Sequence, residues 1–193
     1  DGDCYAEGGN HFLHAIRRNP DITFMVHNNQ VYGLTRGQAS PTCEQGFKTT
    51  VQLHGVLSTP LNPLTLAISQ DASFVGRGYA GNTEHLKELI KEAILHSGFS
   101  FLDILQPCVS FDHKHTYQWY QDRVYLLDEQ YDPSNKTLAF EKAQEWGDSI
   151  PLGIIYKNHR PNYEKLQEVL KEGILVSQKP DRSKVADLVE EFC

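Results

Sequence analysis

Two short polar segments near the start of the chain carry residue types that bind metal ions and phosphates. Asp1-Gly2-Asp3 opens the sequence, and Asn28-Asn29-Gln30-Val31 follows a helix-like and a strand-like segment. Carboxylate and carboxamide oxygens suit Mg²⁺, which takes few protein ligands and completes its shell with water and substrate phosphates. Glycines such as Gly8 and Gly9 let a backbone approach a diphosphate closely. The segments therefore predict a magnesium diphosphate site; the alternative is that both are ordinary turn formers.

Alternating helices and strands are expected to position these segments. The run 22–27 is short and nearly continuously apolar, which indicates a strand buried on both faces. Asn29 then follows the carboxyl end of that strand, and Asp1 is expected to follow a strand that precedes the chain's first residue. Because ligands of open α/β sheets bind beyond the carboxyl ends of the strands, the two segments should face one crevice. A helix over 11–18 would point its N-terminal N–H groups toward it.

The remaining pattern predicts an α/β fold with a mostly parallel sheet and helices on both faces. An irregular segment runs from Gln30 to about Pro63. We expect further strands over 73–79, 99–105 and 151–156, and helices over 83–96, 117–127, 138–146, 163–171 and 183–192, the last capped by Asp181 or Ser183. Residues 1–112 are predicted to form the α/β domain. Residues 113–193 are predicted to be an extension that packs on that domain or on a partner subunit.

Composition excludes several classes of function. The 193 residues carry 18 Lys and Arg against 25 Asp and Glu, a net charge of −7, and no basic run is longer than Arg17-Arg18. This argues against nucleic-acid binding, which rests on clustered basic residues. No apolar run approaches the roughly 18 residues of a membrane span, and no signal peptide is recognisable. Four cysteines far apart in the sequence, without a CxxC pair, favour reduced thiols and a cytoplasmic location.

Three blocks of sequence resemble the β subunit of the 2-oxoacid:ferredoxin oxidoreductases. They are residues 7–19, 31–42 and 106–111, and Asp1-Gly2-Asp3 with Asn29 and Val31 is similar to the Gly-Asp-Gly to Asn motif of thiamine-diphosphate enzymes. The resemblance implies the thiamine-diphosphate-binding fold, incomplete at its N-terminus. It also implies oxidative decarboxylation of a 2-oxoacid (2-oxoglutarate or pyruvate) with coenzyme A to an acyl-CoA, electrons passing through an iron–sulfur cluster to ferredoxin. The implied partner chain is the α subunit of a heteromer.

The same resemblance assigns roles to single positions. It implies that the Asp1 carboxylate, the Asn29 side chain and the main-chain carbonyl of Val31 hold Mg²⁺, which holds the diphosphate of the cofactor. The implied cofactor contacts are Gly2, Asp3, Gly33 and Leu34, with Thr35 as a weaker candidate. Arg36 is expected to meet the substrate carboxylate, for which a bidentate guanidinium is suited; the alternative is a solvated loop arginine. Cys108 matches the fourth thiolate ligand of a 4Fe–4S cluster.

One departure from the family pattern limits these expectations. The other three cluster ligands belong to a family segment upstream of this chain's start, and Cys4, Cys43 and Cys193 do not match them. Since a cuboidal cluster needs about four thiolates, it is not expected in this chain alone. We expect an N-terminally truncated subunit, inactive as an isolated fragment, whose upstream segment was cleaved, omitted or is a separate chain. The alternatives are a non-redox thiamine-diphosphate enzyme and an inactive binding or assembly module.

Overall fold

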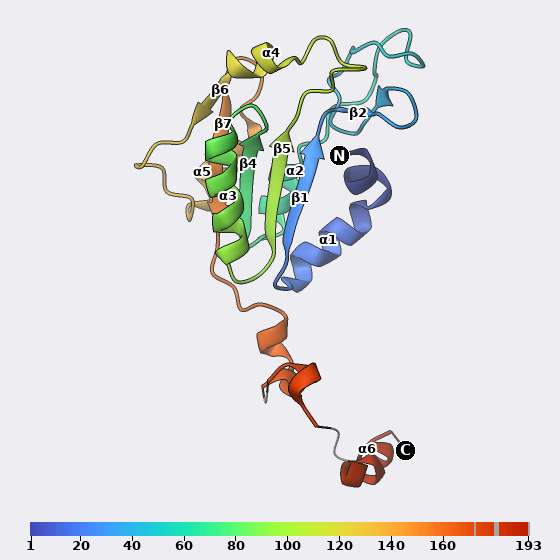
Figure 1. The fold of residues 1–193 in the computed structure, drawn as a ribbon, viewed down its shortest axis with the longest axis vertical. Helices are drawn as coiled ribbons and strands as arrows, with labels where there is room; N and C mark the ends of the chain where they lie inside the picture. Colours follow the sequence, from blue (N-terminus) through green and yellow to red (C-terminus); the bar gives the residue numbers. More distant parts are fainter. Residues whose placement is uncertain (172, 180–181, 193) are drawn as a thin grey trace.

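A five-stranded sheet forms the centre of the fold in the computed structural model, which describes residues 1–171, 173–179 and 182–192 (Figure 1). The strand order is β1-β5-β4-β7-β6. The strands are β1 (Thr23–Asn28), β5 (Ser100–Leu105), β4 (Phe74–Tyr79), β7 (Ile150–Lys157) and β6 (Val124–Leu126). The first three run parallel, β7 is antiparallel to β4, and β6 is parallel to β7. The predicted α/β class with a mostly parallel sheet is confirmed.

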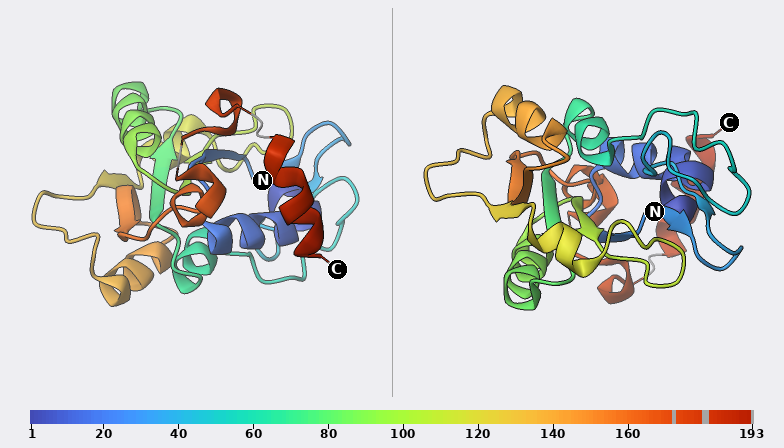
Figure 2. Two further views of the ribbon diagram at one scale, coloured as in Figure 1. Left: turned by 90° about the horizontal axis from the view of Figure 1, so that it is seen from below. Right: turned by 90° about the horizontal axis from the view of Figure 1, so that it is seen from above.

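Helices cover both faces of this sheet, as Figure 2 shows from its two ends. The helices α1 (Gly9–Arg18), α2 (Pro63–Ser69) and α5 (Lys136–Gln144) lie on one face, and α3 (Thr83–Leu95) lies on the other. Successive side chains of a strand point to opposite faces. Val75 and Phe101 therefore pack under the first three helices, whereas their neighbours Phe74 and Leu102 pack under α3.

The irregular segment 30–63 holds two short strands, and a helix that the sequence did not predict follows it. The strands β2 (Val31–Tyr32) and β3 (Gln38–Ala39) form an antiparallel pair. At α2 the side chain of Asn62 accepts hydrogen bonds from the N–H groups of Leu64 and Thr65, and proline occupies the first helical position. An N-cap asparagine followed by proline is a helix-start signal, which was available in the sequence.

Two predicted helices in the second half of the chain are wrong. Residues 117–127 form the short helix α4 (Tyr117–Gln121) and then β6, because Val124 and its neighbours pair with β7 instead of extending the helix. Residues 163–171 form two 3₁₀ turns, η2 (Glu164–Leu166) and η3 (Glu168–Leu170). Leu166 and Val169 are exposed there, so no packed apolar face supports an α-helix.

The end of the chain runs away from the sheet, below it in Figure 1. It contains the turns η4 (Leu175–Ser177) and η5 (Arg182–Lys184) and the helix α6 (Val185–Glu190), inside the predicted range 183–192. Asp181, one of the two predicted caps, lies outside the described residues. The elements β6, α5 and β7 belong to the central sheet and its cover, and residues 158–165 still contact the lower end of the sheet. The division at residue 112 stays a prediction. Within the described ranges, no helix has the length and apolar character needed to cross a membrane.

Asn19 joins the lower ends of three elements. It ends α1 in the left-handed conformation (φ 54°) and is fully buried. Its Oδ1 accepts hydrogen bonds from the Ser73 hydroxyl (2.7 Å) and the Phe99 N–H (2.9 Å), just before β4 and β5 begin. Its Nδ2 donates to the carbonyl of Pro161 (3.1 Å). Asparagine is one of the few non-glycine residues that adopts this backbone conformation readily.

We expect Asn19→Ala to lower the free energy of unfolding by about 3 kcal/mol. The substitution leaves the Ser73 hydroxyl and the Phe99 N–H without the acceptor that Asn19 provides, and it places alanine, which disfavours positive φ, at that position. Urea unfolding followed by circular dichroism measures the change. Asn10→Ala, at an exposed position of α1, is the matched control and should stay within about 0.5 kcal/mol of the parent. Equal effects of the two substitutions would contradict this account of Asn19.

Candidate functional site

A pocket of about 250 Å³ opens at the carboxyl end of β1. It is lined by Asp1, Gly2, Asp3, His27, Asn29, Val31, Tyr32, Gly33, Leu34 and Thr35. All eight residues that the sequence predicted to contact Mg²⁺ or thiamine diphosphate are among them. The structure thus brings the two polar segments together at the carboxyl end of one strand, where ligands of open α/β sheets bind. Their roles as ligands stay predictions.

Short main-chain contacts hold the two walls of this pocket together. The main-chain nitrogen of Asp1 donates to the carbonyl of His27 (2.9 Å), which fixes the first residue against the end of β1. Asn29 Oδ1 accepts the Val31 N–H (3.1 Å) across a turn in which Gln30 has a φ of 65°. A Cβ on Gly2 would lie 2.3 Å from the Tyr32 ring, so packing within the chain requires glycine there.

The donor set of the pocket fits Mg²⁺ by its chemistry. Asp1 contributes a carboxylate, Asn29 a carboxamide oxygen and Val31 a main-chain carbonyl, and hard oxygen donors are the ones that this cation takes. Across the described part of the chain, no three His, Cys, Asp or Glu side chains gather as a metal site. The oxygen donors of the pocket differ from those of structural zinc sites, which are built mostly from nitrogen and sulfur ligands.

The rim of the pocket carries features that contacts within the described chain do not explain. The space around a Cβ on Gly33 is open to beyond 4 Å, so no protein atom near that position calls for glycine. Leu34 beside it is fully exposed at 100%. A close approach of a ligand to the Gly33 backbone and to the Leu34 side chain would account for both.

Two predicted functional residues lie outside the pocket lining. Arg36 is exposed and has a φ of 80°, and its carbonyl accepts a hydrogen bond from Thr50. Cys108 is half-buried in the loop after β5, where its carbonyl accepts the Asp112 N–H (3.1 Å). The structure therefore places neither side chain against the predicted cofactor residues.

The described cysteines do not form a cluster site. Cys4, Cys43 and Cys108 are all free, and Cys193 lies outside the described residues. Burial raises the pKa of the Cys4 and Cys43 thiols to about 11, so both are held as thiols at neutral pH. A 4Fe–4S cluster needs about four thiolates. The described residues therefore do not fit a complete cluster.

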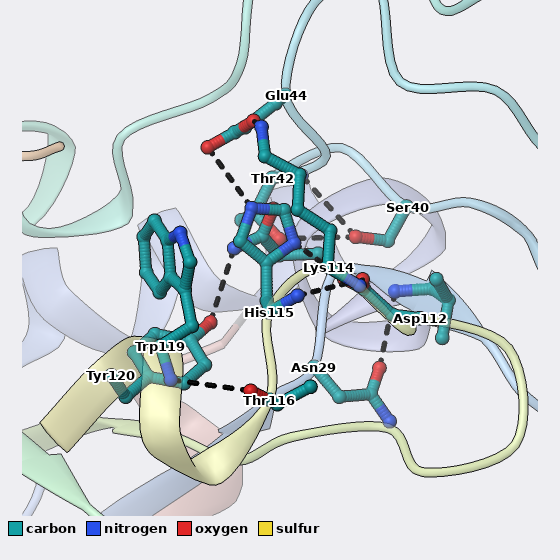
Figure 3. Close-up of polar contacts among 12 residues, drawn as sticks. Asn29, Ser40, Thr42, Glu44, Asp112, Lys114, His115, Thr116, Trp119 and Tyr120 are labelled. Atoms are coloured by element: carbon teal, nitrogen blue, oxygen red, sulfur yellow. Dashed lines mark hydrogen bonds and ion pairs between the residues drawn. The ribbon is translucent and has the colours of Figure 1, made fainter. Parts of the chain in front are cut away.

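A polar cluster that the sequence did not predict joins two loops near the pocket (Figure 3). His115, only 2% exposed, lies between two carboxylates: Nδ1 is 2.5 Å from Asp112 Oδ2 and Nε2 is 3.0 Å from Glu44 Oε1. The Lys114 ammonium also contacts Glu44. We call Glu44, Asp112, Lys114 and His115 the loop clasp.

The loop clasp fastens the loop of Cys108 to the loop that follows β3. Asp112 Oδ1 accepts the N–H groups of Lys114 (2.9 Å) and His115 (3.0 Å), which closes the turn before α4. Burial acts to raise the pKa of Glu44 and of Asp112, but hydrogen bonds from Lys114 and His115 outweigh it and hold both pKa values below the usual 4.5 and 3.8. Glu44 lies 70 residues from Lys114, so no spacing in the sequence could have revealed that contact.

The loop clasp should make stability depend on acid pH. Carboxyl groups with lowered pKa contribute stability that is fully present above their unfolded values and is lost as pH falls through the folded values. We therefore expect Glu44→Gln to lower the melting temperature at neutral pH and to flatten its fall below about pH 4.5. Thermal melts from neutral to acid pH measure both. Glu129→Gln, at an exposed position, should follow the parent curve; a Glu44→Gln curve parallel to the parent would contradict the assignment.

Comparison with known proteins agrees with this architecture. Residues 1–104 match the family model described as "Thiamine pyrophosphate enzyme, C-terminal TPP binding domain", and residues 108–172 match the model for the C-terminal part of the pyruvate ferredoxin oxidoreductase β subunit. A 2-oxoacid:ferredoxin oxidoreductase subunit β of Saccharolobus solfataricus is 47% identical over 169 residues, 82% of this chain and 55% of the relative. A second such β subunit, from Aeropyrum pernix, is 40% identical over 187 residues, 91% of this chain and 60% of the relative.

A solved structure extends the likeness to the fold. The 2-oxoglutarate:ferredoxin oxidoreductase of Magnetococcus marinus, with 2-oxoglutarate, coenzyme A and succinyl-CoA bound, has a TM-score of 0.88 and 32% identity, over 97% of this chain and 65% of that one. The chain thus spans 55–65% of the length of these relatives. By sequence and fold, the chain belongs to the thiamine pyrophosphate enzymes through their C-terminal TPP-binding domain, and it is similar to the β subunits of 2-oxoacid:ferredoxin oxidoreductases.

Proposed function

We propose that this chain supplies the thiamine-diphosphate site in the β subunit of a 2-oxoacid:ferredoxin oxidoreductase. The observation that carries the proposal is the pocket at the end of β1, whose lining contains every residue that the resemblance assigns to the cofactor and its metal. The unexplained glycine at position 33 and the exposed Leu34 on its rim support it further.

In this proposal the residues of the pocket bind and orient the cofactor. The Asp1 carboxylate, the Asn29 carboxamide oxygen and the Val31 carbonyl hold Mg²⁺, and the backbone from Gly33 to Thr35 contacts the cofactor, as Gly2 and Asp3 do from the opposite wall. When bound, thiamine diphosphate supplies the electron sink for decarboxylation of a 2-oxoacid. The protein's contribution is to hold the reactive end of the cofactor in a fixed position and to exclude water.

The substrate and the partners follow from the relatives. We propose a 2-oxoacid, 2-oxoglutarate or pyruvate, as substrate, coenzyme A as acyl acceptor, and an α subunit and ferredoxin as partners. The relatives' names and the coenzyme A and 2-oxoglutarate bound in the Magnetococcus marinus enzyme support this. Arg36, exposed on the loop after Leu34, is available to meet the substrate carboxylate. No comparison favours a non-redox enzyme or an inactive module over this reaction.

Loss of a proposed metal ligand should weaken cofactor binding. In the complete oxidoreductase we expect Asp1→Ala and Asn29→Ala each to raise the thiamine diphosphate dissociation constant at fixed Mg²⁺ about a hundredfold, because one oxygen ligand of the metal is lost. Fluorescence or calorimetric titration measures this, and excess Mg²⁺ should partly restore binding. Asn10→Ala is the control. An unchanged dissociation constant in both variants would refute the assignment of Asp1 and Asn29 as metal ligands.

We also propose that Cys108 is one cluster ligand, completed by thiolates that the described residues do not contain. Cys108→Ser in the complete oxidoreductase is expected to lower bound iron and 2-oxoacid-dependent ferredoxin reduction, since serine is a poor ligand for this cluster. Cys43→Ser, which alters a buried thiol of raised pKa, is the matched control and should leave iron unchanged. Iron content per protomer is measured directly, and full iron content in Cys108→Ser would remove this residue from the ligand set.

A further inference from the structure

A chain of hydrogen bonds leads from the buried core of the sheet to the carboxylate of Asp1. The Asp103 carboxylate on β5 is 1% exposed and accepts from Asn28 Nδ2 at 3.0 and 3.3 Å. Asn28 Oδ1 lies 2.8 Å from the Thr42 hydroxyl, which in turn lies 3.1 Å from Asp1 Oδ2. Tyr5 donates to Asp103 Oδ1 at 2.8 Å.

The direction of this chain follows from its buried end. The Asn28 amide nitrogen donates to both Asp103 oxygens, and these two contacts orient the amide group. The Asn28 oxygen must then face Thr42, whose hydroxyl becomes the donor. Asn28 is 3% and Thr42 is 7% exposed, although both line a pocket of about 410 Å³. Neither side chain can reorient without losing a buried partner.

The Thr42 hydroxyl has one proton for two acceptors. The Asn28 and Asp1 oxygens share it as a three-centre contact. Ser40 Oγ, 3.0 Å away, is placed to donate to the Thr42 oxygen (Figure 3). Thr42 is β-branched, which restricts its first side-chain torsion and so the position of its hydroxyl oxygen. The carboxylate oxygen that contacts it is thereby restricted as well.

We propose that Thr42 is a positioning residue that fixes the Asp1 carboxylate through Oδ2 and leaves Oδ1 to bind the metal as a single oxygen ligand. The inference rests on the proposed function, since it takes Asp1 to be a Mg²⁺ ligand. Asp103, Asn28 and Ser40 serve it by holding Thr42. The benefit is preorganisation: the metal meets a carboxylate whose orientation is already restricted, so less freedom is lost on binding.

The test measures metal affinity and needs no turnover. The complete oxidoreductase, stripped of Mg²⁺ by chelation and saturated with thiamine diphosphate, is titrated with Mn²⁺ while electron paramagnetic resonance counts the free ion. We expect Thr42→Val to raise the Mn²⁺ dissociation constant roughly tenfold, the size expected for one hydrogen bond to a charged group. Thr42→Ser, which keeps the hydroxyl, should stay within about threefold of the parent. Thr59→Val, at an exposed position, is the matched control and should not differ from it.

Each outcome decides between the two proposals. If Asp1→Ala weakens Mn²⁺ binding about a hundredfold but Thr42→Val stays within twofold, the role of Thr42 is refuted and the metal site stands. If Asp1→Ala leaves Mn²⁺ binding unchanged, the proposed metal site itself fails. Equal losses in Thr42→Val and Thr42→Ser would exclude the hydroxyl as the cause. Should Thr42→Val fail to assemble, Thr42→Cys, whose thiol is a weak donor, replaces it under the same criteria.

Discussion

The buried carboxylate of Asp103 is the constraint around which the upper end of the sheet is organised. A charge in the interior is costly unless it is hydrogen-bonded, and burial raises the pKa of this group. Tyr5 and Asn28 donate to it, and Arg77 occupies the facing register position on β4, where its positive charge acts to lower that pKa. The Arg77 guanidinium is itself tied to main-chain carbonyls of Ala143 and Glu145 at the end of α5. One acidic group in β5 thereby joins the end of β1 to the π-helix η1 (Asp3–Glu7) before α1, and Arg77 beside it joins β4 to the end of α5.

The predicted fold is confirmed, and the predicted site residues line one pocket, for the same reason. The pocket residues follow directly from a strand end and a glycine-rich turn, so a buried apolar run and its flanking polar residues suffice to place them. The strands β1, β4 and β5 and the helix α3 have strong local patterns. Sequence reasoning failed at β6, where pairing with β7 overrode a helix-like spacing. It also failed at residues 163–171, where apolar side chains such as Leu166 and Val169 are exposed among the described residues.

The residues that support the site were beyond sequence reasoning for a physical reason. Thr42 is 41 residues from Asp1 and 14 residues from Asn28, and His115 meets Glu44 across two loops, so no local spacing indicates these contacts. Which buried polar side chains meet depends on the register of the parallel strands. The strands β1 and β5 pair in parallel, and parallel strands need a crossover connection of a dozen or more residues, so local sequence does not reveal their register. What the sequence revealed was the part of the site that is local in the chain.

The register of β1 with β5 has a consequence for how the loop clasp forms. Glu44 and Lys114 are separated by 70 residues, and closing so long a loop from the unfolded chain carries a large entropic cost. Once Asn28 is paired with Leu105, most of that closure has already occurred, because the two loops leave from adjacent strand ends. Forming the loop clasp then costs only the conformational entropy of ordering two shorter segments, one from Asn28 to Glu44 and one from Leu105 to Lys114. Salt bridges that would be too weak to order these loops in an open chain can therefore order them on the folded sheet.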